Sequence, residues 1–165
     1  KHFNEYSKAL ARLSSKNWDS TENFYFVWRF FVESMLKNPK IYYNFSSETW
    51  TGFGSLFKRY YELFPEEADK LSPDLMDMYY GKNIQERCMK LLLTIKDKDN
   101  QITSKNINMI NTIIVASVKY ILEQKCMEPE LDSDILTRDL MNIIEYTISN
   151  SHIGNTIFYY KKKLL

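Results

Sequence analysis

The sequence predicts an all-α fold, an orthogonal bundle of about seven or eight helices in a single domain over residues 1–165. Three observations support this prediction. Apolar residues recur at helical spacing along most of the chain. Hydrophobic residues make up 44% of the sequence, enough to close a sizeable core. There are four glycines and four prolines, too few for the many tight turns of a β-sandwich or β-barrel.

Capping and breaking residues divide the first half of the chain. Asp19 followed by Glu22 is a capping-box pattern that starts a helix, and Asn38–Pro39 ends it. Pro65 terminates or kinks an aromatic-rich helix. The helices predicted for this half cover residues 1–13, 20–37, 40–45 and 48–64.

The second half holds longer helices. Ser72–Pro73 is a strong helix start, because proline is favoured at the first helical position. Thr103–Ser104 and Ser133 are predicted to cap the next two helices. The helices predicted here cover residues 73–96, 104–126 and 133–149. Residues 152–165 fit either a docked helix or a frayed tail.

Charge and cysteine usage restrict the possible partners. The 22 Lys and Arg residues against 21 Asp and Glu give a net charge of +1, so this chain by itself is not expected to bind nucleic acid. Cys88 and Cys126 lie in separate segments without a CxxC partner, as expected for thiols of a reducing compartment. The longest apolar run, residues 106–118, is too short to span a membrane. With no secretory signal pattern at its start, the chain is predicted to be cytoplasmic.

Signatures of catalysis are missing from the sequence. It has no HExxH motif, no glycine-rich phosphate loop and no nucleophile-elbow serine. Its two histidines, His2 and His152, lie near opposite ends of the chain. We therefore expect a protein that is not an enzyme and that uses neither a metal nor a cofactor.

The last two long helices are apolar on more than one face. The helix from Ser104 carries one apolar seam through Ile107 and Ile114 and a second through Met109 and Ile113. The alternatives are that other segments cover the second faces within one chain, or that the two helices pair with those of a second copy in an intermolecular four-helix bundle. We expect the dimer. Its predicted interface residues are Ile107, Ile110, Ile114, Val118, Leu136, Leu140 and Ile143.

Aromatic residues are concentrated in the middle helices. Such stripes are commonly plain core, but bulky rings packed imperfectly with methionines also favour a cavity for a flat or amphipathic ligand. The predicted ligand-binding residues are Phe24, Trp28, Phe31, Trp50, Phe57, Tyr61, Tyr79 and Tyr80.

Two stretches resemble the C-terminal domain of the tetracycline repressor (TetR) family of bacterial transcription regulators. Residues 24–45, FYFVWRFFVESMLKNPKIYYNF, are similar to the family's helix that ends in a short NPxxY-type break. Residues 103–131, TSKNINMINTIIVASVKYILEQKCMEPEL, are similar to its first dimerisation helix and the following loop. The N-terminal helix-turn-helix of the family is missing from this sequence, and the resemblance places residue 1 within the helix that would connect to it.

The resemblance implies a one-component switch. In such a regulator a hydrophobic or amphipathic effector binds the C-terminal domain of a homodimer and changes the affinity of the N-terminal domains for operator DNA. The effector, the operator and the choice between repressor and activator stay open. The alternative is a non-enzymatic helical adaptor that binds a partner helix in an apolar groove.

Overall fold

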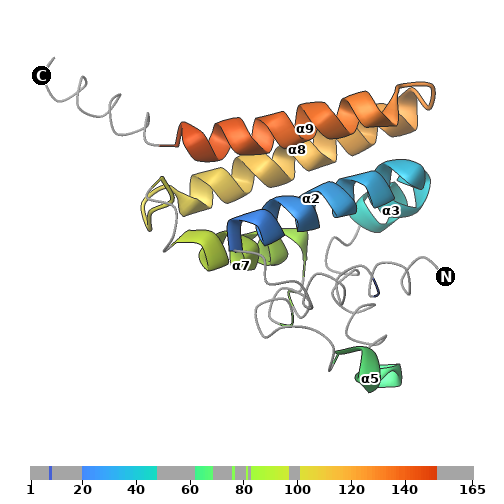
Figure 1. Cartoon of the computed structure of the whole chain (residues 1–165). Helices are drawn as coiled ribbons and strands as arrows, with labels where there is room; N and C mark the ends of the chain where they lie inside the picture. Colours follow the sequence, from blue (N-terminus) through green and yellow to red (C-terminus); the bar gives the residue numbers. More distant parts are fainter. Residues whose placement is uncertain are drawn as a thin grey trace, which may run out of the picture.

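The computed structural model describes residues 8, 20–47, 62–68, 76, 81, 83–96 and 101–151. The described helices are α2 (Ser20–Lys37), α3 (Pro39–Ser47), α5 (Pro65–Ala68), α7 (Ile84–Lys96), α8 (Ile107–Met127) and α9 (Ser133–Ser149) (Figure 1). The described residues include no strand, so the predicted all-α class is confirmed. The predicted number of helices is untested, because residues 1–7, 9–19, 48–61, 152–165 and most of 69–82 lie outside the described part.

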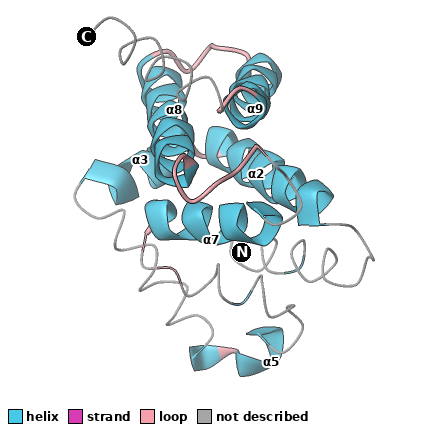
Figure 2. Ribbon diagram, turned by 90° about the vertical axis from the view of Figure 1, so that its left-hand side faces the viewer, coloured by secondary structure: helices cyan, strands magenta, loops and turns pink. Residues whose placement is uncertain are grey.

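Four of these helices form a bundle within one chain. Helix α2 packs against α7 and α9, and α8 packs against the same two helices from the opposite corner (Figure 2). Helix α3 follows α2 directly and packs against α8. The layer formed by α8 and α9 therefore lies on one side of the molecule, with α2 and α7 beneath it (Figure 1).

The centre of the bundle is filled by aliphatic side chains from all four helices. The side chains of Met35 in α2, Ile95 in α7, Ile114 in α8 and Leu140 in α9 are fully buried. Asn111 is a buried polar exception, and its Nδ2 donates a 3.1 Å hydrogen bond to the carbonyl of Gln85, which joins α8 to α7.

The sequence places α2 well but misplaces the start of α7. Helix α2 ends before Asn38–Pro39 as predicted, and α3 then begins at Pro39. A single helix over residues 73–96 is wrong, since Gly81 is not helical and α7 begins only at Ile84. The Asn83 side chain accepts a 2.9 Å hydrogen bond from the Glu86 amide, so this asparagine caps α7.

The start of α8 and the cap of α9 differ from the prediction. Residues 103–106 form a turn, and α8 begins at Ile107 rather than Ser104. Helix α9 has the predicted bounds, but its cap is Asp132 instead of Ser133. The Asp132 carboxylate accepts hydrogen bonds from the amides of Asp134 and Ile135 at 2.8 and 3.2 Å.

Candidate functional site on the outer face of α8 and α9

Helix α8 has two apolar faces, and the structure buries one of them. Each residue advances by about 100° around an α-helix, so Ile110, Ile114 and Val118 share the side that enters the bundle, where all three are fully buried. On the opposite side, five residues fall within about 60° of one another. These residues form what we call the outer stripe: Met109, Ile113, Ala116, Tyr120 and Met127.

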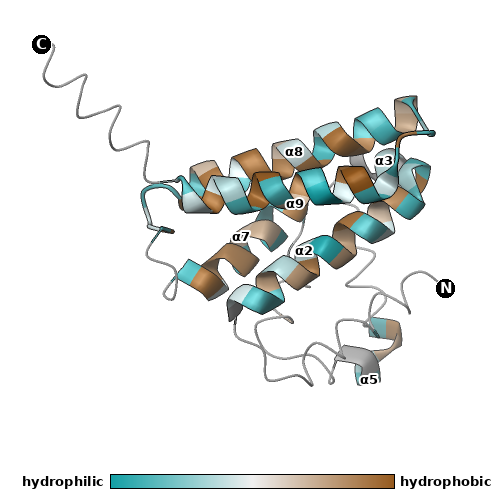
Figure 3. Ribbon diagram, turned by 45° about the horizontal axis from the view of Figure 1, so that its top comes forward, coloured by the Kyte–Doolittle hydropathy of each residue, from teal (hydrophilic) through white to brown (hydrophobic). Residues whose placement is uncertain are grey.

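The outer stripe is exposed along its whole length. Tyr120 and Met127 are the most open, at 62% and 70% exposure. Helix α9 adds three more exposed apolar side chains, Ile135, Ile143 and Tyr146. Together with the outer stripe they form the outer face. Apolar residues recur along both helices in the view that brings their upper side forward (Figure 3). Seven of the twelve large apolar side chains that are exposed in the described residues belong to this face, so the exposure is concentrated there.

Hydroxyl groups beside the outer face bond within their own helices. Thr112 and Ser117 of α8 donate hydrogen bonds of 2.9 Å to the carbonyls four residues earlier. Thr147 of α9 does the same at 2.7 Å. Because these hydroxyls already have acceptors, covering them with another apolar surface costs little desolvation energy.

The residues predicted for the dimer interface divide between the two sides of the hairpin. Ile107, Ile110, Ile114, Val118 and Leu140 are all buried within a single chain. Leu136 is half-buried, and Ile143 is exposed. The seam of α8 predicted as the dimer interface lies in the core of the single chain, because α2 and α7 pack against α8. The second apolar seam is the one that stays open.

The structure describes three members of the predicted ligand site, all on α2. Phe24 and Trp28 are buried and Phe31 is half-buried. The Trp28 and Phe31 rings meet edge to face with centroids 5.9 Å apart, and Phe31 meets Tyr42 of α3 in the same way at 5.9 Å. The other predicted ligand-binding residues lie outside the described part of the chain: Trp50, Phe57, Tyr61, Tyr79 and Tyr80.

The aromatic cluster of Trp28, Phe31 and Tyr42 contains a buried donor. The Trp28 Nε1–H is buried and has no hydrogen-bond partner among the described residues. Leaving a buried donor without an acceptor costs about 1–3 kcal/mol. Burial also raises the pKa of Tyr42 to about 12. The three rings thus contact one another, and the Trp28 Nε1–H is a polar group that an acceptor could satisfy.

The described residues contain no cluster of three or more His, Cys, Asp or Glu side chains arranged to hold a metal ion. Burial raises the pKa of the Cys88 thiol well above its ordinary value, which keeps this thiol protonated. Among the described helices, none combines the length and apolar composition needed to cross a bilayer.

Comparison with known proteins identifies no relative of this chain. No family model matches it, and searches of curated proteins and of solved structures likewise give no match. The resemblance to the TetR family therefore stays a prediction from residues 24–45 and 103–131.

Proposed function

We propose that this chain is the dimerisation and effector-binding domain of a one-component transcription regulator, and that two copies meet through the outer face of α8 and α9. The observation that carries the proposal is the exposed outer stripe, which runs from Met109 to Met127 on the side of α8 away from the core. Contiguous apolar patches larger than a few hundred Å² are rare on monomeric proteins and mark interaction sites.

The outer face has the size that a stable dimer needs. The 21 residues of α8 make a helix about 31 Å long at about 1.5 Å per residue. Two adjacent helices are about 20 Å wide, which gives a face of about 600 Å² in projection. A standard interface buries about 800 Å² of accessible surface on each partner. Because accessible area exceeds its flat projection, the face is large enough.

A second copy covers this face better than a single partner helix. A lone helix would cover one of the two exposed rows and leave either the α8 or the α9 row in water. An identical hairpin covers both rows, and a two-fold axis makes the contact self-complementary. The near balance of 22 basic and 21 acidic residues keeps net repulsion between copies small.

The effector part of the proposal rests on the aromatic cluster and on the resemblance to the regulator family. A molecule that carries a hydrogen-bond acceptor on a flat apolar body would satisfy the Trp28 Nε1–H while stacking on neighbouring rings. By linkage, such a molecule would change operator affinity by favouring one arrangement of the dimer.

The test is the mass of the chain in solution. Light scattering on the eluting wild-type peak should give 39.6 kDa, twice the 19.8 kDa of one chain. Ile113→Asp should give the single-chain mass with unchanged helical content, because an unpaired charge is not tolerated in an apolar interface. Leu93→Asp is the matched control. It removes an exposed apolar side chain from α7, outside the outer face, and should remain a dimer. A wild-type monomer, or equal effects of the two variants, would contradict the proposal.

A further inference from the structure

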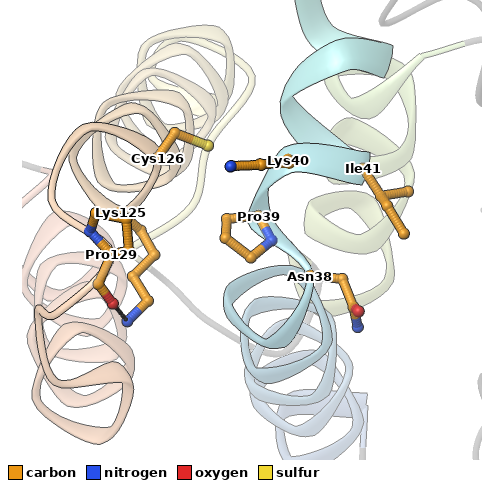
Figure 4. Close-up of a pocket in the computed structure, with 7 residues that line it drawn as sticks. All are labelled: Asn38, Pro39, Lys40, Ile41, Lys125, Cys126 and Pro129. Carbon is orange, nitrogen blue, oxygen red and sulfur yellow. Dashed lines mark hydrogen bonds between the residues drawn. The ribbon is translucent and has the colours of Figure 1, made fainter.

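A pocket lies between the start of α3 and the end of α8, and its described lining includes no residue of the outer stripe or of the aromatic cluster. Its volume is about 320 Å³, near the lower end of the range of about 300–1,000 Å³ for small-molecule sites. Residues from the two helices and from the loop after α8 line it (Figure 4). They are Asn38, Pro39, Lys40, Ile41, Lys125, Cys126 and Pro129.

The described lining of this pocket is positively charged. Two of the described lining residues are lysines, and none of them is an aspartate or glutamate. Lys125 is engaged with the wall of the pocket, since its Nζ donates a 2.7 Å hydrogen bond to the Pro129 carbonyl and another to the Leu131 carbonyl. These bonds hold the loop after α8 against the helix and fix one side of the pocket.

Lys40 supplies the second positive charge. Its side chain is exposed and extends between the two helices toward Cys126 (Figure 4). Burial raises the pKa of the Cys126 thiol, and the nearby Lys40 ammonium partly opposes this shift. Because Lys40 and Cys126 line the same pocket, the ammonium can act on a group that enters it.

The remaining surface of the pocket is mostly apolar. The ring of Pro39 lies beside the Lys40 side chain, across the gap from Pro129 (Figure 4). The proline rings and the thiol offer few groups that need water. A hydrated dianion such as phosphate would gain nothing from these walls, whereas a molecule with one charged end and an apolar body would use both parts of the pocket.

We propose that this pocket binds a small monocarboxylate with an apolar body, whose carboxylate pairs with the Lys40 ammonium and whose body lies on Pro39 and Pro129. The site is separate from the effector site proposed at the aromatic cluster. It uses neither the outer stripe nor the rings around Trp28, so it can be tested whether or not the chain dimerises.

Cys126 provides a local probe for occupancy. The chain has two cysteines, and Cys88 is only 1% exposed, so iodoacetamide should label Cys126 first in the folded protein. Hexanoate bound in the pocket should shield the thiol. At a concentration twice its dissociation constant, two thirds of the sites are filled and the labelling rate falls about threefold. Mass spectrometry of peptides locates the label.

Matched ligands and variants distinguish binding in this pocket from a nonspecific effect of the added compound on the labelling rate. Acetate has the carboxylate but no apolar chain, and hexanol has the apolar chain but no charge. Neither should slow the labelling of Cys126 at the same concentration and ionic strength. Lys40→Gln should lose the protection by hexanoate, and Lys40→Arg should keep it. Lys37→Gln removes an exposed lysine that does not line the pocket, so it should behave as wild type. For each protein the labelling rates with and without ligand are compared, because Lys40 itself affects the pKa of the Cys126 thiol.

The proposal is overturned if hexanoate fails to slow labelling, or if hexanol or acetate slows it equally. It is also overturned if Lys37→Gln abolishes protection as fully as Lys40→Gln. Failure of the dimerisation test would leave these outcomes unchanged, because labelling of Cys126 reports only on the pocket.

Discussion

Asn106 and Ser151, 45 positions apart, are joined by a 3.0 Å hydrogen bond from the asparagine Nδ2 to the serine Oγ. Both side chains also donate to the carbonyl of Gln101, each at 2.7 Å. The three residues tie the start of α8 and the end of α9 to the segment that precedes α8. The hairpin is thereby closed at the end opposite its loop, which fixes α8 and α9 side by side and holds the outer face in shape.

Removing this link should destabilise the fold. Ser151 is buried, so Asn106→Ala leaves its hydroxyl and the Gln101 carbonyl with fewer partners. The expected loss in the free energy of unfolding is about 1–3 kcal/mol, measured by urea denaturation followed by circular dichroism. Asn108→Ala, an exposed site on α8, should change the free energy by less than about 0.5 kcal/mol. Equal losses in both variants would show that the link is not stabilising.

Substitutions at the neighbours Ile113 and Ile114 should destabilise the folded chain to different extents. Ile114 is fully buried, while Ile113 is 39% exposed. Ile114→Ala should lower the free energy of unfolding by about 2–5 kcal/mol. Ile113→Ala should lower it by no more than about 1 kcal/mol in solutions dilute enough to keep the chain monomeric. Urea titration of both variants at the same low concentration checks this. A larger loss for Ile113 would mean that the two faces of α8 are assigned the wrong way round.

The sequence identifies both apolar faces of α8 but cannot show which one turns inward. Helical periodicity places Ile110 and Ile113 on different seams, yet both seams carry isoleucine and neither is marked by charge. Only the packing of α2 and α7 decides the choice. A sequence-based interface that includes Ile110 therefore selects core residues, even though the prediction of two apolar faces is correct.

The sequence predicts the starts of helices less well, for a different reason. Several side chains able to cap a helix stand close together at each start, and the backbone can use only one of them. At α9, Asp132 and Ser133 are both suitable, and the structure uses the aspartate. For α7, the strong helix start at Ser72–Pro73 predicts one continuous helix. The non-helical Gly81 and the cap at Asn83 are therefore not predicted.

Stability should fall in alkaline solution because of Tyr42. Burial raises the pKa of its hydroxyl from 10.0 to about 12. Below pH 10 the phenol is protonated in both states, and its contribution is fully present. Between pH 10 and about 12 the unfolded chain releases the proton while the folded chain retains it, so the free energy of unfolding declines.

Tyr42→Phe should remove this part of the decline. The measurement is the change in urea midpoint between a solution below pH 10 and one between pH 10 and 12. Tyr43→Phe, at the adjacent exposed tyrosine of α3, is the matched control and should decline as the wild type does. If Tyr42→Phe and wild type decline equally, Tyr42 does not carry the predicted linkage.

The most direct test of the outer face as a dimer interface is hydroxyl-radical footprinting in dilute and in concentrated solution. Methionine and tyrosine side chains are readily oxidised when exposed, and the outer stripe contains Met109, Tyr120 and Met127. We predict that oxidation of these three falls in the concentrated sample, while oxidation of Tyr43, an exposed residue of α3, stays constant. Equal oxidation of the stripe at both concentrations, or protection of Tyr43 instead, would contradict dimerisation through this face.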